Sequence, residues 1–183
     1  MDHHIDIQVL PDPEFKETVL MNALYSKLHR ILGQKAEGRI GVSFPNYDKT
    51  LGGLLRLHGT SQDLKRLMEE AWMTGLRDYC TTSEIQEIPG QHKHCIVKRV
   101  QAKSAHNKRS RSIRKGWLTE SEAFTKIPET QQKALQLPFA QLRSLSNDNL
   151  MRVYIEHGSL KDQPMTGTYS SYGLSSSATV PWF

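Results

Sequence analysis

The sequence predicts an α+β protein with an N-terminal ferredoxin-like domain, 1–92, and a C-terminal region, 93–183, that carries a basic helix and a few strands. Three observations support this prediction. Residues 1–92 switch between strand-like and helix-like periodicity in the order β-α-β-β-α-β, which is the ferredoxin-like order. A segment dense in Lys and Arg follows directly. The length of 183 residues suits one domain or two small ones.

The spacing of apolar residues defines the elements of the N-terminal part. Residues 3–10 alternate polar and apolar side chains, which is typical of a half-buried strand. Residues 14–33 carry apolar side chains at helical intervals, and Gly33 is the expected stop. The remaining pattern predicts strands at 39–44 and 54–58, a helix capped by Thr60 or Ser61 that ends near Met73, and a strand near 84–88.

The C-terminal part is expected to contain shorter elements. The pattern predicts an extended segment at 95–101, a helix at 104–115, a helix opened by the capping box Thr119–Glu122, and strands at 137–143 and 151–156 joined by a turn at 144–149. The tail from Gly167 is rich in Ser, Gly and Tyr. We expect its last pair, Trp182 and Phe183, to dock on the core, because exposing both rings would forfeit favourable burial.

Charge is distributed very unevenly along the chain. Of the 24 Lys and Arg residues, nine lie between Lys93 and Lys115, where there is no Asp or Glu, which leaves 15 for the rest of the chain against 19 acidic residues. A slightly acidic body with one concentrated basic segment indicates a polyanionic partner. The alternative is a solvated charged loop, but solvated faces usually mix both signs.

The basic segment becomes one-sided if its second half is helical. At 100° per residue, an arc of about 120° contains four basic residues: Lys108, Arg111, Arg114 and Lys115. Ile113 and Trp117 fall on the opposite side, so one face would meet phosphates while the other docks on the protein. The aromatic signature by which the RNA-recognition motif stacks bases is absent. We therefore expect recognition to depend on the basic segment.

Composition argues against several other classes of protein and site. Two cysteines are too few for a disulfide framework, so we expect a reducing compartment, the cytoplasm. The N-terminus does not have the pattern of a signal peptide, and no apolar run approaches the roughly 18 residues that span a bilayer. The sequence therefore does not predict a membrane protein. His92, His94 and Cys95 lie close together, but no second cluster has zinc-like spacing. We therefore expect no metal and no cofactor.

An RNA substrate would carry its own nucleophile. A ribose 2′-hydroxyl attacks the adjacent phosphodiester when a base removes its proton and the geometry is in line. Histidine suits this role because its pKa lies near neutrality. The chain has eight histidines, so composition alone does not select one.

Short segments along the whole chain resemble one family when they are taken together and in order. They are Pro11-Asp-Pro-Glu-Phe15, Lys27-Leu-His29, Arg39-Ile-Gly-Val-Ser-Phe-Pro45, Arg99-Val-Gln-Ala-Lys-Ser104, Leu142-Arg-Ser144, Tyr172-Gly-Leu-Ser175 and Val180-Pro-Trp-Phe183. This set resembles the CRISPR repeat-processing endoribonucleases of the type I-F (Csy) systems. The resemblance implies metal-independent cleavage of a CRISPR repeat hairpin in precursor RNA, which leaves a 2′,3′-cyclic phosphate and a 5′-hydroxyl.

The same resemblance implies roles for individual residues. It implies His29 as the general base near the 2′-hydroxyl and Tyr172 as the residue that orients it. Ser144 would hold the ribose, with Ser146 as the second candidate. The expected RNA-binding residues are Arg99, Gln101, Lys103, Lys108, Arg109, Arg111, Arg114, Lys115, Met151 and Arg152.

Arg99 and Gln101 would recognise bases near the foot of the RNA stem, while the basic helix enters the major groove. Met151 stands where the family has an aromatic residue that stacks on a base. The resemblance also implies slow turnover, because the product hairpin stays bound as the 3′ end of the guide RNA, and partners among the other subunits of a type I-F surveillance complex. Two alternatives are a non-catalytic hairpin-binding subunit and a structural protein of a different ribonucleoprotein.

Overall fold

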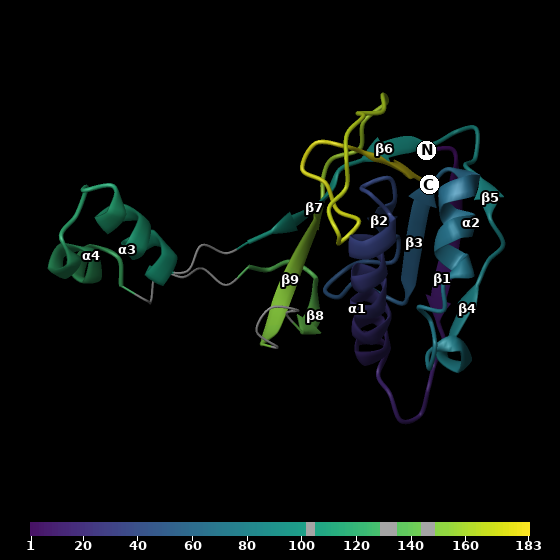
Figure 1. Ribbon diagram of the computed structural model, residues 1–183, viewed down its shortest axis with the longest axis horizontal. Helices are drawn as coiled ribbons and strands as arrows, with labels where there is room; N and C mark the ends of the chain where they lie inside the picture. Colours follow the sequence, from purple (N-terminus) through teal and green to yellow (C-terminus); the bar gives the residue numbers. More distant parts are fainter. Residues whose placement is uncertain (102–104, 129–134, 144–148) are drawn as a thin grey trace. The chain divides into compact units, whose positions relative to one another are not determined.

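The computed structural model describes residues 1–101, 105–128, 135–143 and 149–183, and it shows a mixed α/β protein with several antiparallel sheets (Figure 1). The chain divides into two compact units. The larger contains Met1–Arg99 and Leu137–Phe183, and the smaller contains Val100–Gln136. The predicted domain boundary after residue 92 stays a prediction. No helix in the described ranges is long and apolar enough to cross a bilayer.

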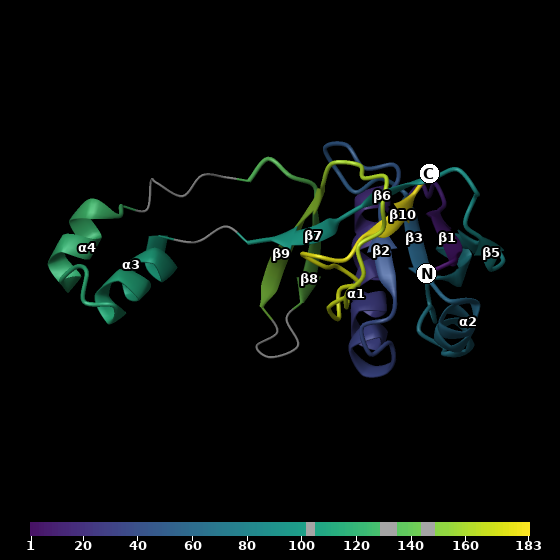
Figure 2. The same ribbon diagram turned by 90° about the horizontal axis from the view of Figure 1, so that it is seen from above.

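The larger unit is built on an antiparallel sheet with two helices. In chain order its first elements are β1 (His3–Val9), α1 (Glu17–Lys35), β2 (Gly41–Ser43), β3 (Leu54–Gly59), α2 (Ser61–Glu69), a 3₁₀ turn (Arg77–Tyr79) and β4 (Cys80–Thr82). The strands lie in the order β2-β3-β1-β4, and the short β5 (Gln86–Glu87) also pairs with β1. Both helices lie on the same face of this sheet (Figure 2).

The core follows the predicted periodicities. Ile5, Ile7 and Val9 of β1 are buried, and they share one apolar cluster with Leu24 and Leu28 of α1. Alternate side chains of a strand point to one face, so this pattern presses one face of the sheet onto the helices. The predicted cap of α2 is confirmed, because Thr60 Oγ1 accepts a hydrogen bond from the backbone N–H of Asp63 at 3.1 Å.

Two helix ends and one strand differ from the prediction. α1 runs through Gly33 and ends at Lys35. Gly33 instead leaves room for the tail, since a Cβ there would lie only 3.3 Å from the Cβ of Ser171. α2 ends at Glu69 rather than near Met73. The pattern did not predict β4, because two of its three side chains are exposed and give no apolar alternation.

Two smaller sheets complete the larger unit. β6 (Lys93–Cys95) pairs with β10 (Val180–Trp182), and β7 (Val97–Val100), β9 (Leu150–His157) and β8 (Phe139–Arg143) form a sheet in that order. The predicted docking of the tail is confirmed. The guanidinium of Arg56 lies 4.0 Å from the centre of the Phe183 ring, and its Nη1 donates to the Phe183 carbonyl at 2.8 Å.

The smaller unit holds α3 (Ala105–Arg114) and α4 (Glu120–Lys126). The predicted capping box is confirmed: the side chain of Thr119 accepts from the backbone of Glu122, and the Glu122 carboxylate accepts from the backbone of Thr119. Arg109 is buried between the two helices. It donates to the carbonyl of Ile127 at 2.9 Å, and its guanidinium lies 4.5 Å from the ring centre of Phe124.

Candidate functional site

One histidine is held in a defined tautomer by the C-terminal tail. His29 lies on α1 and is only 9% exposed, and its Nδ1 is 2.9 Å from the carbonyl oxygen of Ser171. Because a carbonyl oxygen only accepts hydrogen bonds, Nδ1 carries the ring proton. The neutral ring therefore presents an unprotonated Nε2, which is the form that a general base requires.

The ring of His29 is also fixed in orientation by Tyr172. The two rings stack with centroids 3.9 Å apart and planes 4° from parallel. Tyr25, one helical turn before His29, donates from its hydroxyl to the Tyr172 carbonyl at 2.8 Å. Burial raises the pKa of Tyr25 well above its usual range, so this hydroxyl keeps its proton and remains a donor. Helix α1 thus holds both the histidine and the residue that packs on it.

A tight turn at Ser170–Gly173 places the C-terminal tail against His29. The N–H of Gly173 donates to the carbonyl of Ser170 at 2.8 Å, and its carbonyl accepts from the N–H of Val42 at 2.9 Å. Gly173 has a φ of 69°, and a Cβ there would lie 2.2 Å from Cγ2 of Val42. Only glycine fits both the left-handed backbone and this close approach. Gly173 therefore helps to position Tyr172, its neighbour in the chain.

The electrostatic surroundings keep His29 neutral. Burial lowers the pKa of His29 below its usual value, the hydrogen bond to Ser171 opposes this, and the positive charges of Arg99 and Arg30 lower it further. The guanidinium of Arg99 lies 5.0 Å from the centre of the Tyr172 ring. A residue predicted to recognise bases thus contacts the residue that orients the histidine.

The whole chain matches one protein family. The family model described as CRISPR-associated protein (Cas_Csy4) covers residues 4–183. The chain belongs to this family. It is 46% identical over 184 residues to the CRISPR-associated endonuclease Cas6/Csy4 of Escherichia coli (strain UTI89 / UPEC). It is 43% identical over 187 residues to the protein of the same name from Pseudomonas aeruginosa (strain UCBPP-PA14), and both alignments cover 100% of each chain. The predicted family is confirmed.

In this Cas_Csy4 chain the basic stripe that α3 and the next residue carry, called the α3 stripe, is open to solvent. Its members are exposed, and none forms an ion pair within the ranges that the structure describes: Lys108, Arg111, Arg114 and Lys115. Arg109 lies outside the stripe. The other face of α3 differs from the prediction, because Ala105 and Arg109 are buried while Ile113 and Trp117 are 38% and 65% exposed. The long Arg109 side chain forms the buried face instead: its guanidinium packs on Phe124 of α4 and donates to the carbonyl of Ile127, just beyond that helix.

The other residues that were predicted to bind RNA or to hold the ribose differ in their exposure and surroundings. Gln101 is exposed, and Met151 packs partly against the core of the larger unit. Arg152 is exposed and places its guanidinium 4.8 Å from the ring centre of Phe139. Three predicted residues lie outside the described ranges: Lys103, Ser144 and Ser146.

No group of three His, Cys, Asp or Glu side chains in the described part of the chain has the arrangement of a metal site. The rings of His92 and His94 lie edge to face, with centroids 4.9 Å apart. Metal independence stays a prediction, since it concerns the reaction rather than the ligands present.

Proposed function

We propose that this chain is a metal-independent endoribonuclease that cuts CRISPR repeat hairpins in precursor RNA to make guide RNAs. The observation that carries the proposal is the fixed, neutral His29, whose Nδ1 is engaged by Ser171 and whose ring is stacked on Tyr172. Curated relatives that span the whole chain are named endonucleases, which supports the same conclusion.

The proposed reaction uses the RNA as its own nucleophile. Nε2 of His29 accepts the proton of a ribose 2′-hydroxyl, and the 2′-oxygen forms a bond to the adjacent phosphorus. The bond from phosphorus to the 5′-oxygen breaks, and that oxygen takes a proton from solvent water and leaves as a 5′-hydroxyl. The other fragment ends in a 2′,3′-cyclic phosphate. The bond from Nδ1 to the Ser171 carbonyl stabilises the imidazolium that forms. Ser144, with Ser146 as the second candidate, would hold the ribose.

Recognition is proposed to be divided between two sets of residues. Arg99 and Gln101 would distinguish bases at the foot of the stem, because arginine and glutamine side chains form paired hydrogen bonds with base edges. The exposed stripe of α3 would contact phosphates. An A-form major groove is narrow, so the helix enters it where a short stem opens near its loop. Arg109 would hold the smaller unit together rather than meet phosphates, since its guanidinium donates a hydrogen bond to the carbonyl of Ile127.

The product hairpin is proposed to stay bound as the 3′ end of the guide RNA, within a surveillance complex that contains other subunits. We also propose that 1–92 is a ferredoxin-like domain and that 93–183 supplies most RNA contacts. The strand order β2-β3-β1-β4 and the two helices on one face support the first of these.

The direct test of the function is incubation of the protein with labelled CRISPR repeat hairpins and with scrambled hairpins of equal length. We expect one cut, near the 3′ foot of the stem, in the cognate repeat alone. Binding without fragments would favour the non-catalytic hairpin-binding subunit. Equal binding to every hairpin would favour a structural protein of another ribonucleoprotein.

The pH dependence of cleavage should report the neutral His29. The value of kcat/KM should rise with pH through an inflection below about 6.5, the ordinary histidine pKa, and then level off. The rate should rise with pH because a general base acts only when it is unprotonated. Burial lowers the pKa of His29, so the unprotonated, active form should appear at a lower pH than for an ordinary histidine. A single-turnover series at subsaturating protein measures this. An inflection at or above about 6.5 would contradict the assignment.

A further inference from the structure

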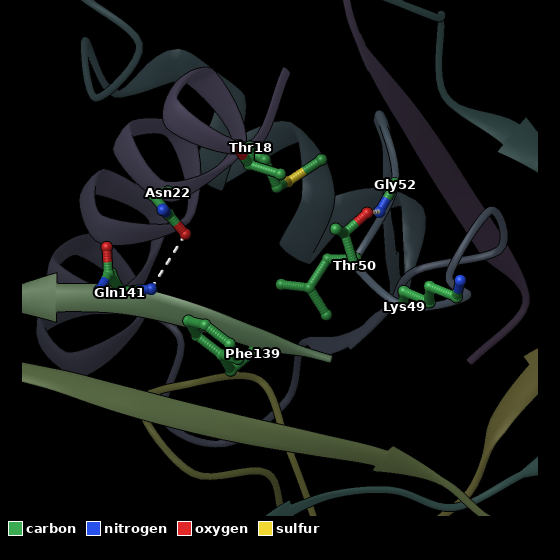
Figure 3. A pocket seen from close by; sticks show the side chains of 9 residues that line it. Thr18, Asn22, Lys49, Thr50, Gly52, Phe139 and Gln141 are labelled. Carbon is green, nitrogen blue, oxygen red and sulfur yellow. Dashed lines mark hydrogen bonds between the residues drawn. The ribbon is translucent and has the colours of Figure 1, made fainter. Parts of the chain in front are cut away.

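A pocket of about 190 Å³ on the larger unit is lined by the start of α1, the loop before β3 and the strand β8 (Figure 3). Its walls are tied to each other, because Oδ1 of Asn22 accepts from the backbone N–H of Gln141 at 2.9 Å. Its aromatic ring is engaged as well. The centre of the Phe139 ring lies 5.4 Å from that of Tyr154 and 4.8 Å from the guanidinium of Arg152. Protein groups therefore already use the ring in this pocket.

One exposed aromatic residue, Trp117 of the smaller unit, differs in this respect. It is 65% exposed, more than any other large apolar side chain in the described part of the chain. A single exposed apolar side chain is ordinary on a protein surface, so the role of Trp117 follows from how its ring is held. The other exposed aromatic residues that the structure describes each pack on a further ring or on a guanidinium: Phe15, Tyr47, Phe124 and Phe139.

The position of Trp117 is fixed by the end of α3. The N–H of Trp117 donates to the carbonyl of Ser112 at 3.0 Å, and the N–H of Gly116 donates to that of Ile113 at 2.9 Å. Gly116 has a φ of 68°, the left-handed conformation that glycine adopts without strain. These are the two hydrogen bonds of a Schellman motif, which turns the chain back at the end of a helix. The turn sets Trp117 against the last turn of α3.

This turn leaves the ring without apolar cover and places it beside the α3 stripe. In a Schellman motif the residue after the glycine usually packs on an apolar side chain at one of the two positions that Ser112 and Arg111 occupy here. The Trp117 ring lies instead by Lys115, whose Nζ is 4.5 Å from the ring centre. Helical spacing had placed Trp117 on the opposite side from the stripe, and this was wrong because α3 ends at Arg114.

An aromatic ring next to a lysine ammonium has the chemistry of a nucleotide site. Every nucleobase has a flat π-face that stacks on an aromatic side chain, and the ammonium suits the phosphate of the same nucleotide. From Lys93 to Thr119 the sequence has no acidic residue. The next two acids belong to the first turn of α4, where the helix N-terminus favours a carboxylate, and Glu122 is engaged by Thr119 and Lys126.

The same surroundings favour RNA over a protein as the occupant. The cores of protein–protein interfaces are depleted in charged residues, and lysine is depleted across the whole interface. A protein that covered the Trp117 ring would also cover the ammonium of Lys115, which forms no ion pair within the described ranges. An RNA strand would meet both groups with complementary chemistry.

We propose that Trp117 stacks on one unpaired base in the loop of the hairpin while Lys115 contacts a phosphate of that nucleotide. The inference rests on the proposed function, in which the α3 stripe lies in the groove where the stem opens near its loop. Bases within the stem are paired and stacked on each other, whereas loop bases can be splayed out onto an aromatic ring. Stacking does not depend on the edge of a base, so the contact would hold the loop without selecting its sequence.

The test is a double-mutant cycle on binding with the full chain. The probes are repeat hairpins with a 2′-deoxyribose at the cut, each either intact or abasic at one loop position. In wild type, one abasic position should weaken binding by about five- to 150-fold, the range of one base–aromatic stack. Trp117→Ala should weaken binding of the intact hairpin by a similar factor. The combination should add nothing, because both changes remove the same stack.

Four comparisons separate stacking from other effects of the substitution. Trp117→Phe keeps a π-face and should lose less than about fivefold, whereas Trp117→Leu should behave as Trp117→Ala does. Replacing the stacked base by any other base should change binding little. Trp117→Ala should keep the wild-type salt slope, since no charge is removed, and the wild-type cleavage rate at saturating protein, which shows that it is folded. Leu160→Ala removes a side chain that is 53% exposed on the larger unit, and it should bind every probe as wild type does.

Several results would overturn the inference. One is that Trp117→Ala binds the intact hairpin as tightly as wild type does, which would leave the ring free for a protein partner. Another is that the losses multiply at every loop position. Coupling confined to an abasic site in the flanks of the hairpin would overturn the assignment to the loop. A wild-type protein that neither binds nor cuts the bare hairpin would overturn the proposed function itself, and the inference with it.

Discussion

Replacing His29 by alanine should lower the single-turnover cleavage rate by about 10²–10⁴-fold, which is the usual contribution of a general base. Affinity for the repeat hairpin should stay nearly unchanged, because proton transfer stabilises the transition state and not the bound substrate. Rates at saturating protein and equilibrium binding to an uncleavable hairpin measure the two effects separately. Cleavage at more than about a tenth of the wild-type rate would remove His29 from the mechanism.

Two variants act as controls for this experiment. His92→Ala removes a histidine whose Nδ1 also meets a backbone carbonyl, that of Pro89 at 2.7 Å, but which does not stack on Tyr172. It should cleave as wild type does. Tyr172→Phe keeps the ring that packs on His29, and the Tyr172 hydroxyl has no hydrogen-bond partner among the described residues, so this variant should also retain activity. A large loss in Tyr172→Phe would mean that the Tyr172 hydroxyl, and not only the stack, is needed, and a large loss in His92→Ala would mean that cleavage does not depend on His29 alone.

Neutralising the α3 stripe should weaken binding to every hairpin and flatten its salt dependence. Each lost phosphate contact lowers the slope of log K against log salt by about 0.9, so the quadruple alanine variant of Lys108, Arg111, Arg114 and Lys115 should lose roughly three to four units of slope. The loss of affinity at about 0.1 M salt should be on the order of 10³-fold. Salt titrations of binding give both quantities.

Arg99→Ala should behave differently, by relaxing discrimination between bases at the stem foot by about 1–3 kcal/mol with little change in salt slope. Lys65→Ala with Arg66→Ala removes two exposed charges from α2 and serves as the matched charge control. An unchanged slope in the quadruple variant would mean that the stripe is only a solvated charged face.

Local sequence patterns were sufficient to predict the elements whose buried and exposed residues repeat regularly within a short stretch of the chain. β1 alternates from Ile5 to Val9, and the capping box at Thr119 is encoded within four residues, so both were predicted. β4 was missed because two of its three side chains are exposed. Trp72 is buried, but it lies beyond the end of α2, which no helical pattern in the sequence indicates.

The candidate site depends on contacts that no local pattern encodes. His29 meets Ser171 across a separation of 142 residues, through a backbone carbonyl that any residue type supplies. The resemblance to a family selected His29 and Tyr172, whereas composition offered eight histidines. The stacking of Arg99 on Tyr172 and the anchor from Tyr25 became visible only in three dimensions. The spacing of Tyr25 one turn before His29 was the one signal in the sequence.

The most direct measurement compares two repeat hairpins that differ only in ribose or 2′-deoxyribose at the cut site, each incubated with the protein in excess EDTA. The account predicts that the ribose hairpin is cut completely, with a 2′,3′-cyclic phosphate on one fragment and a 5′-hydroxyl on the other. The deoxyribose hairpin should bind equally well and stay intact. Cleavage of the deoxyribose hairpin at the same bond, or cleavage of the ribose hairpin only after Mg²⁺ is added, would contradict the account.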